Sequence, residues 1–369
     1  MNREYNQLPV PTYRWAKVNH CILEDVKIEN ALPAKAVVEG PIQRGAAEAV
    51  LPAFQGANSE LLREAAGSEE QFLLQIEANG MQHAGIHYEL TENTPSVCGR
   101  LHISAKENSK TTIHLTFDGD APLGFVNFLT TVEAAEGAEV KIIKTQLHGN
   151  GVRHIEHRYV YAADNARVEA VNAEMGGAEV LHYYTYDLCG KESAMDQKTI
   201  YLGNDNQKLD FSYIMAHKGE KSFSDLITTG ALMSGAKKTF RGTIDFHRGA
   251  RRAEGAEEDV CLLLDETVHS VSLPLLLCKE DDVSGNHAAS AGQIDRDKLF
   301  YLMSRGFSEQ EAKHIIVESN LRPIIDQLED EVLENRVLQM VRQKMDYCCN
   351  PDKGAPCHGK CKKRFPYSK

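Results

Sequence analysis

A recurring pattern of short strands and small-residue corners constrains the fold of this chain most strongly. Between residues 72 and 277, apolar and polar residues alternate in short runs, which is typical of half-buried strands. The corners between these runs carry small residues, among them Ala138, Ala166, Ala236 and Ala250, which are 28, 70 and 14 residues apart, all multiples of fourteen. Repeated strand-and-corner units predict a solenoid, in which each unit buries its face against its neighbours. A β-sandwich would give similar strands, so this alternative stays open.

Length, charge and cysteine usage narrow the class of protein. A chain of 369 residues exceeds what one compact core usually supports, which favours several domains or an elongated fold. With 41 basic and 53 acidic residues the net charge is −12, so no broad basic field is available for nucleic acid. No apolar run approaches a membrane span, the N-terminus has no signal-peptide core, and the nine cysteines form no disulfide framework. We therefore expect a cytoplasmic protein with reduced thiols that binds neither nucleic acid nor membrane.

The stretch 280–306, which follows the repeats, is the most specific part of the sequence. His287 lies among small residues, so we expect a turn that presents this histidine to a partner. A short helix should follow, because Asp295 is a good N-cap and Gly306 can adopt the left-handed conformation that ends a helix. Ser308 then begins a second helix, with a capping box completed three residues later.

This stretch resembles the signature of the SufB/SufD family, the scaffold subunits of the Suf iron–sulfur cluster assembly machine. The matching identities are Asp282-Val283, His287-Ala288-Ala289, Gly292-Gln293-Ile294-Asp295, Leu299-Phe300-Tyr301-Leu302-Met303-Ser304-Arg305-Gly306 and Glu311-Ala312. So many fixed identities in one short stretch make the resemblance specific. Trp15-Ala16-Lys17-Val18-Asn19 also fits a segment that the family places against its main body.

The resemblance decides between the two all-β folds, because the SufB/SufD core is a right-handed parallel β-helix. We therefore expect a mainly β protein in four parts. These are an irregular or helical N-terminal segment (1–71), the β-helix core (72–291), a C-terminal helical domain (292–346) and a cysteine-rich basic tail (347–369).

The C-terminal domain is expected to consist of two further helices that cap the solenoid. Ala312, Ile315 and Ile316 form an apolar stripe on the first of them. A break at Arg322-Pro323 should separate this helix from a longer amphipathic one, because proline removes a helix hydrogen bond.

The resemblance also implies a function at the last strands of the core. The runs 259–265 and 269–278 are apolar, as expected of strands covered on both faces, and in this family SufB and SufD pair there. His287 matches the SufD histidine thought to hold the nascent cluster at that interface. The turn 265–269 lacks the cysteine of the SufB pattern, which favours a SufD-like subunit. Cys261 and Cys278 flank this turn as weaker candidate ligands, although a small apolar core residue is the default interpretation of each.

The resemblance implies two protein partners and no enzymatic activity in this chain. A SufB-like scaffold would share the transient iron–sulfur cluster, and a SufC-like ABC ATPase would dock on the helical domain and hydrolyse ATP. The docking residues would be Leu299, Phe300, Tyr301, Leu302 and Arg305. Whether the chain forms a homodimer when SufB is absent stays open, and no sequence feature supports a flavin.

The tail is unusual for the family and allows two interpretations. Its cysteines Cys348, Cys349, Cys357 and Cys361, together with His358, are candidate ligands for zinc or a cluster, although their spacing is not a standard ligand pattern. The same residues also suit a flexible basic tail that meets an acidic partner.

The alternative function is a β-helix enzyme, such as a lyase or hydrolase acting on an acidic or sugar polymer. It would require a groove with clustered charged residues, which the sequence does not reveal. The core histidines give no metal-binding spacing either. His154 and His157 are three residues apart, and residues three apart in a strand face opposite sides, so satisfied or surface histidines are favoured.

Overall fold

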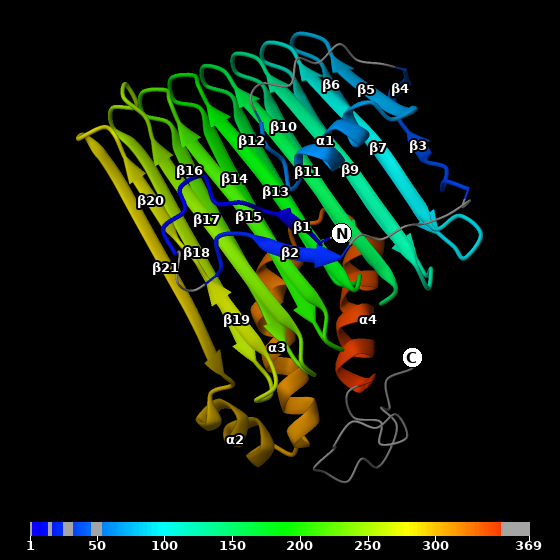
Figure 1. Ribbon diagram of the computed structural model, residues 1–369. Coiled ribbons are helices and arrows are strands. Elements are labelled where there is room, and N and C mark those ends of the chain that lie inside the picture. The colour runs from blue at the N-terminus through cyan, green and yellow to red at the C-terminus, as the bar shows by residue number, and fades with distance from the viewer. Residues whose placement is uncertain (1, 14–16, 25–31, 46–53, 348–369) are drawn as a thin grey trace.

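The computed structural model describes residues 2–13, 17–24, 32–45 and 54–347, and its main feature is a solenoid of two stacked, mostly parallel sheets (Figure 1). Among these residues, sheet I contains β3 (Val37–Glu39), β6 (Met81–Leu90), β8 (Lys110–Gly119), β10 (Glu139–Gln146), β12 (Arg167–Glu174), β14 (Ala194–Gly203), β16 (Phe223–Leu232), β18 (Ala253–Leu263) and β21 (Val283–Gln293). Sheet II contains β4 (Gln43–Arg44), β5 (Glu70–Ile76), β7 (Ser96–Ala105), β9 (Gly124–Ala134), β11 (Val152–Ala162), β13 (Glu179–Leu188), β15 (Lys208–His217), β17 (Lys237–Phe246), β19 (His269–Ser272) and β20 (Leu275–Cys278). The prediction of a parallel β-helix is confirmed.

We define one coil as one strand of each sheet together with its two corners. The fourteen-residue spacing of the corners is about half the length of one coil. In sheet I, Lys110 pairs with Glu139 and Glu139 pairs with Arg167, steps of 29 and 28 residues. The four corner alanines are fully buried. Each follows a residue with positive φ, such as Gly137 at 66° and Asn165 at 57°, and glycine and asparagine tolerate this conformation best. The repeat therefore reflects one corner geometry used in coil after coil.

Alternation along each strand divides its side chains between the solenoid interior and the outer face of a sheet. In β8, for example, Ile113, Leu115 and Phe117 are fully buried in the main hydrophobic cluster between the sheets. Burying apolar surface stabilises the fold by about 25 cal/mol per Å². The interior is not apolar throughout, and its polar part is described below.

The N-terminal segment lies over the outer face of sheet II (Figure 1). It contains the antiparallel strands β1 (Asn2–Tyr5) and β2 (Cys21–Glu24) and the helix α1 (Ser59–Ala66), which Asn58 caps. Asn6 is fully buried at the contact and donates to the carboxylate of Asp210, 2.7 Å away, and to the carbonyl of His182. These contacts fix the segment to β13 and β15. Trp15 lies outside the described residues.

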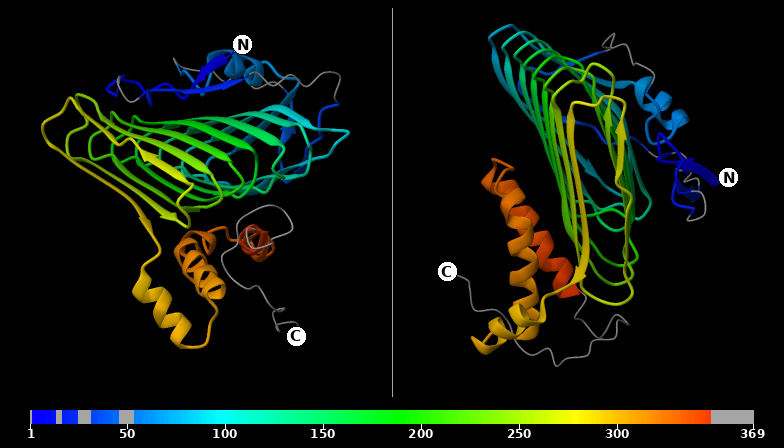
Figure 2. Two further views of the ribbon diagram at one scale, coloured as in Figure 1. Left: turned by 60° about the horizontal axis from the view of Figure 1, so that its bottom comes forward. Right: turned by 90° about the vertical axis from the view of Figure 1, so that its left-hand side faces the viewer.

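Within the described residues three helices follow β21, and the last two of them cover the outer face of sheet I (Figure 2). The three helices are α2 (Arg296–Ser304), α3 (Glu309–Ile325) and α4 (Glu331–Tyr347). The helices α3 and α4 bury apolar residues against β10, β12, β14 and β16, among them Val171, Ile200, Leu321 and Val341. The helix pair predicted to cap the solenoid therefore lies along one of its faces, with the apolar side of each helix against sheet I. No helix within the described residues is long and apolar enough to cross a membrane.

The expected boundaries of α2 and the expected start of α3 are confirmed, whereas the expected end of α3 is wrong. Asp295 caps α2, Gly306 has φ of 100°, and Ser308 forms the predicted capping box with Glu311. Pro323, however, lies inside α3, which continues to Ile325. The helix ends soon afterwards, so proline in its last turn disrupts little of the hydrogen-bonding pattern.

Candidate functional site at the open end of the solenoid

The last coil leaves one edge of each sheet open. Within the described residues β21 pairs only with β18, so its outer edge carries unpaired backbone groups along eleven residues (Figure 2). All residues from His287 to Gln293 in this strand are exposed, and most of them are small. An edge that exposes backbone N–H and C=O groups is a template for pairing with another strand.

His287 lies in the middle of β21 and not in a turn, so that expectation is wrong. The small residues around it form an extended strand because β18 offers eleven backbone partners in parallel register. A Cβ atom built on Gly285 would lie 2.8 Å from Leu276 and 3.0 Å from Phe246, which places this face of the strand toward the interior. His287 follows two residues later on the same face. Its side chain is exposed, so it lies at the open end of the interior.

Of the two cysteines that the sequence suggested as weaker ligands, Cys261 is separated from His287 along the strand. Cys261 on β18 is in register with Ala291, four residues along the strand from His287, a distance of roughly 13 Å. It is buried, and burial raises the pKa of its thiol above the usual value. Cys278 is exposed at the end of β20, where its Cα partner is Phe246 of β17. Among the described residues no three His, Cys, Asp or Glu side chains are gathered closely enough to hold a metal ion.

The tail cysteines lie outside the described residues. Their role as zinc or cluster ligands stays a prediction.

A buried acidic side chain, which the sequence analysis missed, lies one coil below His287. Glu257 is the Cα partner of His287, and its side chain is only 3% exposed. Its carboxyl group occupies the space beside Gly242, where a Cβ atom would overlap it. Burial, followed by the charge of Asp259, raises the pKa of Glu257 to about 8. Asp259 itself forms an ion pair with buried Lys238.

The helix α2 lies next to this end and is the most exposed helix of the chain (Figure 2). None of its residues is buried. Phe300 and Tyr301 are 73% and 56% exposed, whereas Leu299 and Leu302 are half-buried. The Arg305 guanidinium group lies 5.2 Å from the centre of the Tyr301 ring. The predicted docking residues thus form one exposed apolar and aromatic helix beside the open edge.

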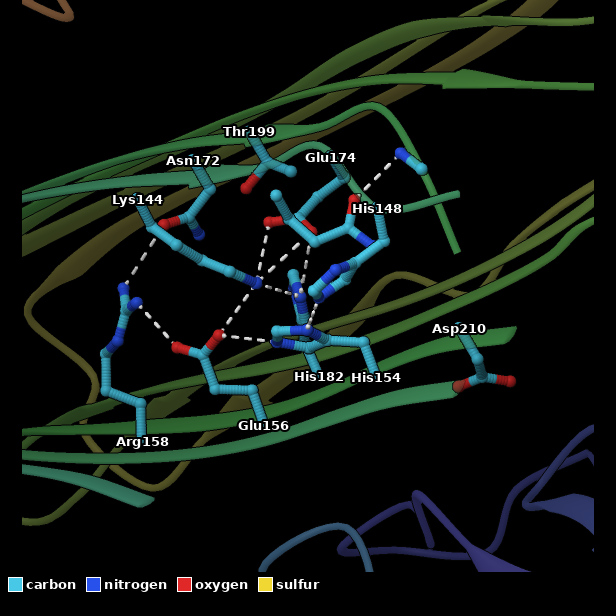
Figure 3. Close-up of polar contacts among 12 residues, drawn as sticks. Lys144, His148, His154, Glu156, Arg158, Asn172, Glu174, His182, Thr199 and Asp210 are labelled. Carbon is cyan, nitrogen blue, oxygen red and sulfur yellow. Dashed lines mark hydrogen bonds and ion pairs between the residues drawn. The ribbon is translucent and has the colours of Figure 1, made fainter. Parts of the chain in front are cut away.

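A second polar cluster lies in the middle of the solenoid interior (Figure 3). Lys144 contacts the carboxylates of Glu156 and Glu174 at 2.7 and 3.0 Å and the Nε2 atom of His182 at 3.0 Å. All four side chains are fully buried. Arg158 contacts the other oxygen of Glu156 at 2.9 Å. Two cations therefore balance two carboxylates in a water-excluded space.

The core histidines are satisfied neutral groups, in agreement with the favoured interpretation. His154 points into the interior, where its Nδ1 atom lies 3.2 Å from His148. His157 points to the opposite side, accepts from the backbone N–H of Ala57 and donates to Asn127. Burial lowers the pKa of His154 to about 4 and that of His157 to about 3.

These shifts predict a steep loss of stability in mild acid. Below pH 6.5 the unfolded chain protonates His154, His157 and His217, whereas burial holds their pKa values in the folded protein at about 4, 3 and 4. Each group then lowers the free energy of unfolding by about 1.4 kcal/mol per pH unit as the pH falls. Glu257 acts in the opposite sense: its raised pKa makes stability fall as the pH rises from about 4.5 to about 8.

Urea denaturation at pH 5 to 8 measures both effects. We expect the free energy of unfolding to be largest near pH 6.5 to 7, and Glu257→Gln should remove part of the decline above that range. A free energy that stays constant from pH 7 to 5 would contradict the buried neutral histidines.

Comparison with known proteins agrees with this fold. The sequence profile described as "SUF system FeS cluster assembly, SufBD core domain" matches residues 88–320. The chain is similar to the iron–sulfur cluster assembly protein SufD of Bacillus subtilis (27% identity over 59% of this chain and 50% of the relative). It is also similar to SufBD family proteins of Staphylococcus epidermidis (28% identity over 55% of this chain and 44% of the relative) and Mycobacterium tuberculosis (25% identity over 55% of this chain and 24% of the relative). The chain thus spans half or less of the length of these curated relatives. Because the profile covers more than half of the chain, from β6 to α3, this protein belongs to the SufB/SufD family of the SUF iron–sulfur cluster assembly system.

Proposed function

We propose that this chain is the SufD-like subunit of a cytoplasmic Suf complex, in which it pairs with a SufB-like scaffold and docks a SufC-like ABC ATPase. The observation that carries the proposal is the unpaired edge of β21 with His287 at the open end of the interior. A nascent iron–sulfur cluster would be built at the interface between the two scaffold subunits and then released.

The open edge suits a partner that continues the solenoid. Small side chains such as Ala288 and Ser290 leave the backbone of β21 accessible to another strand. Main-chain hydrogen bonds to a matching edge would supply affinity, and alternate side chains would supply specificity. A SufB-like solenoid has an edge of this kind in the pairing expected for the family, and a second copy of this chain is the alternative when that partner is absent.

His287 would provide one ligand from this side of the interface. Imidazole is a less common cluster ligand than thiolate, and it suits a site that must release its cargo. We infer no catalytic role for the chain, because ATP hydrolysis would belong to the ATPase partner. The relatives and the site give no support for a flavin.

The helix α2 would dock the ATPase. Large apolar side chains that are exposed together mark interaction surfaces, and Phe300, Tyr301 and Met303 are all more than 40% exposed. The helix joins β21 to α3, so a force applied to α2 would reach the open edge directly.

Co-expression without oxygen tests this function. The chain should co-purify with the SufB-like and SufC-like proteins of its host as a coloured complex with sulfide-to-iron charge-transfer absorption. A Phe300→Ala/Tyr301→Ala variant should lose the ATPase and keep the scaffold partner. Leu123→Ala, which removes an equally exposed side chain far from this end, should behave as the unmodified chain. A colourless monomer that ignores both partners would contradict the proposal.

The alternative of a β-helix enzyme would require a groove with clustered charged residues, and a charged groove on sheet I gives it little support. This groove of about 350 Å³ runs over the outer face of sheet I and contains residues of both charge signs. Its lysines are already paired, Lys110 with Glu139 and Lys141 with Glu169 and Glu329. Paired charges neutralise one another and leave no concentrated field for a charged polymer.

A further inference from the structure

The ladder of side chains beneath His287 points to a specific ligand. Along the inward face of sheet I, Leu226, Glu257 and His287 are Cα partners in three successive coils. Neighbouring parallel strands are about 4.8 Å apart, so the side chains of directly paired residues on one face lie next to each other. Glu257 therefore has an apolar neighbour below it and an imidazole above it, toward the open end.

The carboxyl group of Glu257 is incompletely satisfied within the described residues. Its Oε2 atom is buried and forms no hydrogen bond within the part of the chain that the structure describes. Buried carboxylates are normally paired with a cation or with hydrogen-bond donors, because leaving one unsatisfied is costly. What distinguishes the Glu257 oxygen is its place one coil below the open end, where a group supplied from outside can reach it.

A cation that displaces the proton of Glu257 would satisfy this oxygen. The last closed coil directs Lys238, Glu257 and Asp259 into the interior. Lys238 contacts Asp259, so one positive charge is already used by one carboxylate. Glu257 is the remaining acidic group, and the side chain above it, His287, offers a ring nitrogen for which no hydrogen bond is found among the described residues.

We propose that Glu257 and His287 together hold a single ferrous ion at the open end of the solenoid, with water in the remaining coordination positions. A carboxylate oxygen and an imidazole nitrogen on one side of an open site are the donors that mononuclear ferrous centres use. Gly242 is essential to this arrangement, since any side chain there would displace the carboxyl group. Two protein ligands give a labile site, as a delivered substrate requires.

This inference rests on the proposed function, because iron is a component of the cluster that the complex would build. It adds Glu257 as a ligand. It also adds a state of the protein, in which this chain binds ferrous iron before any cluster forms and without a partner. Glu257 would remain in place beneath His287 when the cluster forms.

Anaerobic titration of the full-length chain with ferrous ion against a chromophoric chelator tests the site. The unmodified chain should bind one equivalent that is lost, or weakened at least tenfold, in Glu257→Gln and in His287→Ala. Glu258→Gln is the matched control, because Glu258 is the next residue of β18 but is exposed on the outer face. His287 is exposed and Gln is nearly the same size as Glu, so both variants should melt within a few degrees of the unmodified chain.

Two outcomes would overturn the inference. One is iron binding by Glu257→Gln equal to that of the unmodified chain, as would occur if tail cysteines held the metal. The other is the absence of a stoichiometric site in the unmodified chain. Neither outcome affects the co-expression experiment, which depends on the partners: a coloured complex combined with unchanged iron binding by Glu257→Gln would refute the ferrous site alone.

Discussion

Replacing Lys144 by methionine is expected to lower the free energy of unfolding by about 3–5 kcal/mol. Lys144 is fully buried and lies between the carboxylates of Glu156 and Glu174 (Figure 3). Methionine fills a similar volume, so the loss would come from two buried carboxylates that face each other with one cation fewer. Burial by itself would raise the pKa of Glu174, but Lys144, His182 and His154 together lower it to about 2, and Lys144 is the strongest of these three.

Lys110→Met is the matched control for this substitution. Lys110 also lies in sheet I and pairs with a carboxylate, Glu139, at 2.8 Å, but both side chains are about half exposed. Exposed ion pairs contribute about 0–1 kcal/mol, so this variant should unfold almost as the unmodified chain does. Urea denaturation at pH 7 measures both variants. A Lys144→Met/Glu174→Gln double variant should recover part of the loss, and equal stabilities of Lys144→Met and Lys110→Met would contradict a structural role for the buried cluster.

The solenoid could be predicted from sequence because its repeating unit is local. The corner alanines and the residues of positive φ before them recur with the coil, and alternation marks the strands between them. The helix ends were equally readable: the caps at Asp295 and Ser308 depend on one or two side chains and on neighbouring backbone. Where the helices pack could not be read in this way, since it depends on which face of the solenoid is most apolar.

The buried polar cluster was missed because composition argues against it. Lysine and glutamate are rarely fully buried, so the sequence alone gives no reason to place them in the interior. The alternation along the strand nevertheless indicates the burial of Lys144. It lies two and four residues after Ile142 and Val140, which point into the interior, so its side chain is on the same face. What could not be foreseen is that β10, β11, β12 and β13 bring complementary charges together at one level, because this depends on the register between the two sheets.

For the candidate site, the sequence singled out His287 but did not foresee the residues around it. The resemblance singled out His287, but small residues suggested a turn where β18 imposes a strand. Glu257 precedes His287 by 30 residues, about one coil. With the coil length in hand, this carboxylate could have been placed beneath the histidine. Cys261 shows the converse: it is near His287 in sequence, yet its register partner is Ala291, four residues further along the strand.

His287→Ala is expected to reduce the iron and sulfide content of the co-purified complex about tenfold or more while the subunits stay together, since loss of even a ligand's outer-shell partner costs 10–100-fold in metal affinity. The complex should persist because its affinity would come from the edge of β21, whose backbone this substitution leaves unchanged. The measurement is iron and acid-labile sulfide per complex, together with the mass of the complex after anaerobic purification.

His269→Ala separates a ligand role from a general effect of removing a surface histidine, because His269 is also exposed and lies in the same last coil. It should leave the cluster content unchanged, whereas His287→Cys should restore part of it by offering a thiolate at the same position. Dissociation of the His287→Ala complex would instead show that the imidazole packs against the partner. A full cluster content in an intact His287→Ala complex would place the ligands entirely on the partner, and this chain would then contribute the edge of β21 and the helix α2, but no ligand.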